Sequence, residues 1–335
     1  MNAEKLEKLP PPPGIIGSLR AGFDVVSSHV WLILLPIFLD SFLWLGMRIS
    51  AGEIYSNAVA GILETLKTRP LPAEEVKLLT DSVESFSRFN WLSWIRTFPV
   101  GIPSLEAFII PAQDPRLNPF GLRSVIQLDS IWNLLGWSGL LTLVGWIGGS
   151  MYFRWVSMAV LGREEAGISI LRAIFQTIVI SVVWTLCLLV VLIPVTLVVG
   201  LAGLFSATLA NGLLFVILIL SYWLVVPFFF MPHGIFARKQ NALYSLYSSV
   251  WLTRFTLPTS GMFVFTAFLL TRGLNFLWSV PESDSLMRLV GISGHAFIST
   301  TLLAASFVYY RDMNAWLQTV FAQLQPKQDL PTQQA

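Results

Sequence analysis

The stretch HVWLILLPIFLDSFLWLG, from His29 to Gly46, is apolar almost throughout and carries one carboxylate, Asp40, near its middle. A helix that crosses a bilayer needs about 20 predominantly apolar residues. Further segments of the same character follow along the chain, and the predicted spans are 30–49, 131–153, 173–201, 205–232, 258–280 and 286–310. The predicted fold is therefore an all-α polytopic transmembrane bundle with six spans.

The composition supports lipid as the solvent of this chain. Hydrophobic residues make up 55% of it and charged residues only 12%, and the mean hydropathy is +0.69. A soluble domain carries about 25% charged residues. The net charge of +2, without a basic patch on a groove-reading element, excludes nucleic acid as a partner. The predicted partner is the lipid bilayer, and a second copy of the chain or other membrane subunits are further candidates.

Little in the sequence supports cofactor or metal chemistry. The single cysteine, Cys187, cannot form an internal disulfide or build a metal site alone. The chain contains neither a phosphate-binding glycine loop nor a cluster of metal-ligating residues. We therefore predict no cofactor, no metal site and no catalytic site.

The orientation follows from the basic residues in the short connections, which favour the cytoplasmic side. The connections after the second and fourth spans hold Arg154, Arg163, Arg172, Arg238, Lys239 and Arg254. Both termini are thus predicted to be cytoplasmic, in the inner membrane. Residues 1–29, which lack the pattern of a signal peptide, should form a cytoplasmic segment with an amphipathic helix, and residues 30–310 the membrane domain. Residues 311–335 should form an amphipathic helix and a disordered tail.

The long connection over 50–130 then lies outside. Val76, Leu79, Val83 and Phe86 have the three-four spacing of one helix face. The prolines that follow forbid a long helix: Pro99, Pro103, Pro111, Pro115 and Pro119. The sequence predicts a helical cap that ends in an irregular lid.

Amphipathic segments precede the odd-numbered spans on the inner side. They are GIIGSLRAGFDVV, EEAGISILRAIF and NALYSLYSSVWLTRF, and a last one, MNAWLQTVFAQL, follows the sixth span. Such helices are predicted to lie in the headgroup plane. The alternative is that they merely extend the spans.

Two stretches resemble six-helix bacterial membrane proteins related to the membrane domain of glycerophosphodiester phosphodiesterases. One is GIIGSLRAGFDVVSSHVWLILLPIFLD, and the other is VVPFFFMPHGIFARKQNALYSLYSSVWLTRFTLP, with its basic turn and its Ala242, Ser245 and Ser248. The outer insert departs from the compact members of that group. The resemblance implies the topology and no reaction, because the phosphodiesterase chemistry of those enzymes resides in a separate soluble domain.

Three polar residues lie deep in their predicted spans: Asp40, Arg272 and His295. A charge at the centre of a spanning helix costs about 2.5–3.5 kcal/mol, and pairing relieves that cost. At 1.5 Å of rise per residue the three come to similar depths, so we predict a buried cluster in which Asp40 pairs with Arg272. It would lock helix packing, or serve a proton or substrate route in which His295 titrates. Alternatively, Arg272 extends outward and Asp40 meets water or a break in the backbone.

The sequence GISG, Gly291 to Gly294, matches the serine pattern of rhomboid-type intramembrane proteases. Ser293 would need a histidine on another helix as its base, and His295 lies on the same helix, facing away. Small residues more simply permit close helix packing, here and in Gly145 to Gly149. His233 is predicted to lie at the membrane interface.

Two classes of function stay open at this point. The first is a non-enzymatic membrane component that organises lipid or belongs to a larger assembly. The second is a small carrier that uses Asp40, Arg272 and His295, and an intramembrane enzyme ranks third. A polar cavity that touches this cluster would favour transport, and a closed packed core would favour the structural role.

Overall fold

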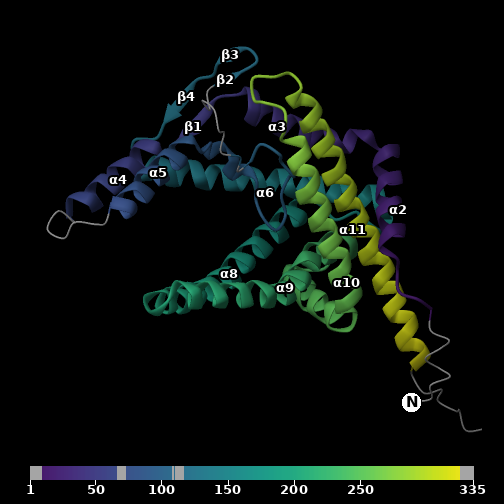
Figure 1. Cartoon of the computed structure of the whole chain (residues 1–335). Coiled ribbons are helices and arrows are strands. Elements are labelled where there is room, and N and C mark those ends of the chain that lie inside the picture. The colour runs from purple at the N-terminus through teal and green to yellow at the C-terminus, as the bar shows by residue number, and fades with distance from the viewer. Residues whose placement is uncertain (1–9, 66–72, 108, 110–116, 325–335) are drawn as a thin grey trace, which may run out of the picture.

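The computed structural model describes residues 10–65, 73–107, 109 and 117–324, and most of them form helices (Figure 1). Five helices are long and apolar enough to cross a membrane: α6 (Ile131–Leu161), α8 (Ile170–Phe205), α9 (Ala207–Arg238), α10 (Ala242–Trp278) and α11 (Arg288–Leu324). A sixth span exists if the bent pair Ile15–Ser28 and Val30–Leu45 counts as one. The protein is a multi-pass helical membrane protein. The disordered tail predicted over 325–335 lies outside the described residues.

The first predicted span, 30–49, differs from the observed structure. A 3₁₀ turn (Val30–Ile33) leads into α3 (Leu34–Leu45), and the chain is already extended in β1 (Arg48–Ser50). The apolar pattern continued beyond Leu45, but the helix ends there because Gly46 is extended and donates its backbone N–H back to the carbonyl of Phe42. This span is therefore shorter than predicted and depends on α2 (Ile15–Ser28) for its length.

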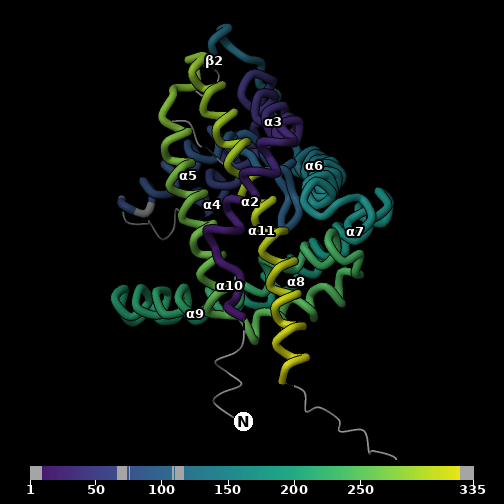
Figure 2. Tube along the Cα trace, turned by 90° about the vertical axis from the view of Figure 1, so that its right-hand side faces the viewer, coloured from purple at the N-terminus to yellow at the C-terminus, as the bar shows by residue number. Residues whose placement is uncertain are grey.

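Helix α2 packs lengthwise on α11, and the two views agree on this (Figures 1 and 2). A Cβ atom on Gly22 would come within 2.6 Å of the Ala305 nitrogen, so the two backbones touch. In the connection that precedes α11, the Ser283 carbonyl accepts the indole N–H of Trp44 from α3 at 2.6 Å. Helix α2 thus runs antiparallel to α11, and α3 continues the chain after a 95° bend.

The segments predicted to lie in the headgroup plane before the third and fifth spans are continuous with those spans. Helix α8 runs from Ile170 and α10 from Ala242 without a break, and α11 likewise continues to Leu324. These helices are continuous with the spans, which fits the alternative that they extend them, and the in-plane position stays a prediction. The predicted hairpin between the third and fourth spans is confirmed, with Ser206 alone between α8 and α9.

The outer insert begins as a helical hairpin, as predicted. Helices α4 (Gly52–Thr65) and α5 (Ala73–Arg88) are joined by a stack of Tyr55 on Phe86, with ring centroids 4.5 Å apart. Strand β1 pairs in parallel with β4 (Val125–Gln127), and β2 (Leu117–Asn118) pairs with β3 (Gly121–Leu122). Between Arg96 and Asp129 the described residues contain no helix, which agrees with the run of prolines.

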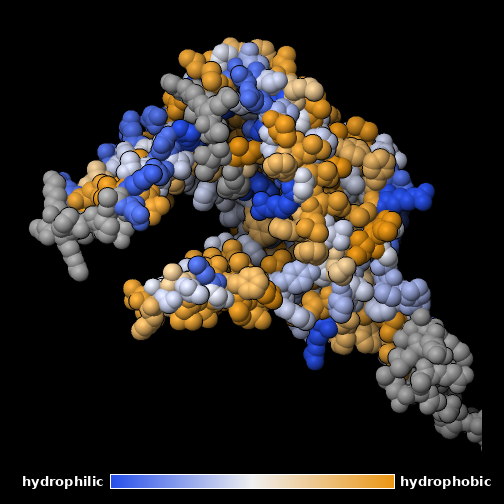
Figure 3. All heavy atoms as spheres, in the orientation of Figure 1, coloured by the Kyte–Doolittle hydropathy of each residue, from blue (hydrophilic) through white to orange (hydrophobic). Residues whose placement is uncertain are grey.

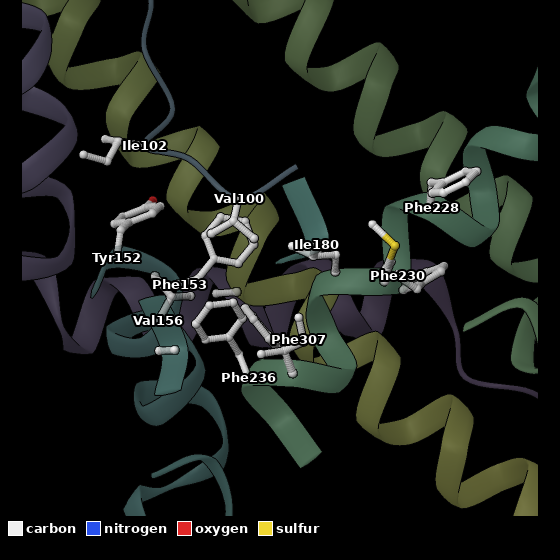
Figure 4. Packing of buried hydrophobic residues seen from close by; sticks show 14 of the residues in the cluster. Val100, Ile102, Tyr152, Phe153, Val156, Ile180, Phe228, Phe230, Phe236 and Phe307 are labelled. Carbon is white, nitrogen blue, oxygen red and sulfur yellow. The ribbon is translucent and has the colours of Figure 1, made fainter. Parts of the chain in front are cut away.

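The core gathers aromatic and aliphatic side chains of α6, α8, α9 and α11 (Figure 4). Tyr152, Phe236 and Phe307 are fully buried in it. Val100 and Ile102 are buried in the same cluster, although both belong to the outer insert. Part of the predicted lid therefore lies inside the helical domain rather than over it.

Candidate functional site

The chain from Trp91 to Ala107 forms a re-entrant segment that enters the helical domain along α6 and returns to the same end. It starts with the 3₁₀ helix η3 (Trp91–Ile95). The indoles of Trp91 and Trp94 donate to the hydroxyls of Ser138 and Thr142, at 3.0 and 3.1 Å. Gly101 then lies against Gly149, which is about 27 Å along α6 from Ile131 at 1.5 Å per residue.

A glycine face on α6 makes room for this segment. A Cβ atom on Gly149 would lie 2.7 Å from the Cα of Gly101, and one on Gly145 would collide with the Ile95 carbonyl. The close packing predicted for these glycines is confirmed, but their partner is an irregular segment and not a helix. Non-helical backbone at membrane depth is tolerated only where protein or a water-filled cavity surrounds it. The glycine face provides that protein enclosure.

Asp40 holds the returning limb of the re-entrant segment. Its carboxylate is fully buried and accepts hydrogen bonds from the Ser104 hydroxyl, from the Leu105 N–H at 2.9 Å and from the Glu106 N–H at 3.2 Å. The Ser104 hydroxyl in turn accepts the N–H of Ala107 at 2.9 Å. A buried carboxylate needs hydrogen-bond donors to offset its loss of water, and backbone N–H groups supply two of them here. They explain the carboxylate in the middle of the apolar stretch.

The predicted ion pair between Asp40 and Arg272 does not form, although the structure describes both residues. Arg272 is exposed, with its guanidinium carbon 5.6 Å from the centroid of the Phe268 ring. Asp40 is instead satisfied by donors of the 104–106 segment, and Arg272 lies exposed over Phe268 of its own helix. The reason is that the 104–106 backbone supplies donors that sequence analysis had assigned to a lid over the membrane.

A second arginine, Arg96, lies at the centre of the predicted cluster. Asp40 attracts its guanidinium and Arg272 repels it, and Arg96 also acts electrostatically on His295. His295 is buried, with Nδ1 2.8 Å from the Oδ1 of Asn275. Arg96 thus interacts electrostatically with each of the three predicted residues, which form no ion pair with one another. Sequence analysis missed Arg96, because it belongs to the insert that was placed outside.

A buried ion pair closes the outer end of the re-entrant segment. Glu106 lies 2.5 Å from the Nε of Arg288, and the side chains are only 12% and 5% exposed. Arg288 also donates to the carbonyls of Ser279 and Pro281, at 3.0 and 2.8 Å. The segment is therefore tied to α3 by Asp40 and to the start of α11 by Glu106. Their separation in sequence concealed both contacts.

The insert also caps α3. Arg123 donates to the carbonyls of Leu43 and Trp44, at 2.9 and 2.7 Å, and so provides partners for the last carbonyls of the helix. Burial lowers the pKa of Arg123 below its usual value, while the charge of Glu106 raises it. The insert and α3 thus stabilise each other.

The remaining sequence candidates have packing roles. The Ser293 hydroxyl donates to the Leu289 carbonyl of its own helix at 2.8 Å, and Gly291 and Gly294 lie against Trp278. This is the predicted close packing of small residues. His233 was predicted at the interface and is instead buried, with Nε2 2.7 Å from the Ser306 hydroxyl. Its aromatic neighbours on α9 and α11 enclose it.

Two cavities lie away from this cluster. One of about 550 Å³ lies between α4, α5 and the β1–β4 pair, and one of about 190 Å³ lies between α6, α7, α9 and α11. Asp40, Arg96, Arg272 and His295 line neither of them. The arrangement at Asp40 therefore ties a segment in place and is not the wall of either cavity.

Comparisons with family models, with curated proteins and with solved structures found no match for this chain. Its class is thus set by its helices alone, as a multi-pass membrane protein.

Proposed function

We propose that the protein is a non-catalytic component of the inner membrane that organises lipid, with both termini in the cytoplasm. The observation that carries the proposal is the closure of the re-entrant segment. Two acids take part in this closure, and both have partners within the chain. Asp40 accepts hydrogen bonds from the segment, and Glu106 pairs with Arg288. A buried ion pair of this kind locks an arrangement and leaves no free acid for chemistry.

The surface of the α8–α9 hairpin supports the lipid role. The most apolar 18-residue stretches of α8 and α9 are only 11% and 17% buried, against 56% for α11. Helices that are apolar all round belong in hydrocarbon. Such a hairpin offers lipid an apolar surface on nearly every side. The resemblance to the membrane domain of glycerophosphodiester phosphodiesterases, which implies topology and no reaction, fits the same proposal.

A carrier is the second candidate, and one observation favours it. Irregular backbone at membrane depth also lines the substrate routes of transporters. The re-entrant segment carries such backbone and includes Arg96, which interacts electrostatically with Arg272 of α10. In a carrier the segment would withdraw from the glycine face of α6 and open a route past Asp40.

The lipid role is tested by extracting the full-length protein with its surrounding lipid in a styrene–maleic acid copolymer. We expect the co-extracted phospholipids to differ in composition from the bulk membrane. A composition equal to the bulk would overturn the proposal. Proteoliposomes address the carrier: solute or proton flux that the wild type supports and Asp40→Asn abolishes would establish it in place of the lipid role.

A further inference from the structure

The cavity of about 190 Å³ lies where three long helices meet, with α7 (Arg163–Ala166) at its edge. Arg238 of α9 and Arg311 of α11 line it, opposite a single acid, Glu165. Leu161 and two alanines form the apolar part of the wall. Its volume is below the roughly 300 Å³ at which pockets for whole drug-sized ligands begin. It therefore suits a small anionic group that is attached to an apolar body outside the cavity.

The surroundings of this cavity are basic. Helix α6 ends at Leu161 and α9 at Arg238, so the cavity lies at the end of the domain that the basic connections predict to be cytoplasmic. Lys239 donates to the Glu164 carbonyl at 2.7 Å, and Arg172 donates to the Lys239 carbonyl at 2.8 Å, which gathers further cations here. Basic pockets between helices on this side suit the headgroups of anionic lipids.

The contact of Arg238 with α11 orients its guanidinium without neutralising it. Nη1 donates to the Oδ1 of Asn314 at 3.2 Å, and Asn314 is itself held by its donation to the Tyr310 carbonyl at 2.7 Å. The acceptor is a neutral amide, so the positive charge of Arg238 stays available to an anion. A guanidinium has five N–H donors, so donors remain on Arg238 after this contact. Arg311 differs in that its Nε lies 2.8 Å from the carboxylate of Asp312.

We infer that this cavity binds the phosphate headgroup of an anionic phospholipid of the cytoplasmic leaflet, with the acyl chains outside against the apolar helices. The inference rests on the proposed lipid role and names the class of lipid. Arg238 and Arg311 bind the phosphate, and Gln318 and Asn314 line the cavity beside them. A purely structural role for Arg238, at the negative end of the α9 dipole, is the competing explanation.

The test uses the purified full-length protein in phosphatidylcholine nanodiscs, titrated with phosphatidylglycerol and followed by native mass spectrometry and thermal unfolding. We expect saturable binding of phosphatidylglycerol, weakened at least about tenfold in the double variant Arg238→Gln/Arg311→Gln, because charge-assisted hydrogen bonds are lost. Arg238→Lys/Arg311→Lys should retain binding. Arg254→Gln, at an exposed arginine of α10 that does not line the cavity, is the matched control.

Three results would overturn the inference. They are equal binding by the wild type and the Gln double variant, an equal loss in Arg254→Gln, and binding of inorganic phosphate as tight as that of phosphatidylglycerol. If the Gln double variant unfolds in phosphatidylcholine alone, the Lys double variant decides: retained binding of phosphatidylglycerol supports the inference, and lost binding overturns it. In the copolymer extraction, if the wild type and the Gln double variant enrich the same anionic lipid, only this inference fails. If the wild type enriches none, the proposed function fails.

Discussion

Two helical hairpins project from the same side of the molecule and have different surfaces (Figures 1 and 3). The α8–α9 hairpin is covered by hydrophobic side chains, whereas the α4–α5 hairpin mixes hydrophilic and hydrophobic ones. In α5 most apolar residues share one stripe, with Leu78 outside it, while those of α8 point in all directions. A striped helix packs one face and meets water with the other, and a helix that is apolar all round requires hydrocarbon. The two helical hairpins are thus suited to different surroundings, one to water and the other to hydrocarbon.

The largest expected effect comes from charges placed on the apolar hairpin. Leu189→Lys with Leu218→Lys adds one cation to each of α8 and α9 at exposed positions. Each should cost about 2.5–3.5 kcal/mol near the centre of a lipid-facing helix, so the pair should cost about 5–7 kcal/mol. The measurement is the fraction of protein that resists alkaline extraction from membranes, and we expect it to fall sharply.

The matched control places the same charges on the other hairpin. Ile62 of α4 and Leu78 of α5 are 49% and 68% exposed, comparable with 48% for Leu189 and 60% for Leu218. Ile62→Lys with Leu78→Lys should leave the alkali-resistant fraction unchanged, because exposed substitutions in water stay within about 0.5 kcal/mol each. Equal losses in the two double variants would mean that both hairpins meet the same solvent, and the comparison would fail.

The next effect contrasts a buried ion pair of the helical domain with an exposed ion pair of the α4–α5 hairpin. Glu106 and Arg288 are buried, whereas Glu84 and Arg88 pair on the exposed surface of α5. Glu106→Gln should lower the free energy of unfolding by about 3–5 kcal/mol, because Arg288 is left as a buried charge without its acid. Glu84→Gln should lower it by no more than about 0.5 kcal/mol. Thermal unfolding in detergent measures both, and a similar shift for the two would count against the enclosure of Glu106.

A smaller effect separates the two faces of α6. Gly149→Ala would press a Cβ atom onto Gly101, so we expect a loss of about 1–3 kcal/mol from overpacking. Gly139→Ala meets no atom within 4 Å, so it should be neutral or slightly stabilising through helix propensity. Proteolysis within residues 91–107 reports the difference, and should accelerate only in Gly149→Ala. Acceleration in both variants would show that the glycine face does not hold the segment.

Hydropathy predicted the helices well, because the apolar character of a membrane helix can be recognised from the residues of that segment alone. From α6 onward each predicted span coincides with one observed helix, and any predicted residues outside that helix lie at its ends. The α8–α9 turn falls at Ser206. The re-entrant segment escaped prediction, since irregular backbone has no periodic pattern. The donors that satisfy Asp40 lie 64 to 66 positions further along the chain. A deep carboxylate predicts that some partner exists, but only the fold reveals that the partner is backbone.

The last expected effect is of similar size and concerns Asp40 itself, and it reverses the order of losses that pairing with Arg272 would give. Were the two residues paired, Arg272→Ala would be the more damaging change, because it would leave a carboxylate without its cation. The carboxylate instead accepts from Ser104, Leu105 and Glu106. Asp40→Asn keeps one acceptor oxygen and brings an amide that faces donors, so it should cost about 1–3 kcal/mol.

Arg272→Ala removes an exposed side chain and should change the free energy of unfolding by less than about 0.5 kcal/mol. Detergent melting curves of both variants, with Ser104→Ala as a third, measure the order directly. Ser104→Ala should show part of the Asp40→Asn loss, because it deletes one of the same donors. If Arg272→Ala melts lowest, the carboxylate depends on the arginine after all, and the re-entrant segment is not what holds it.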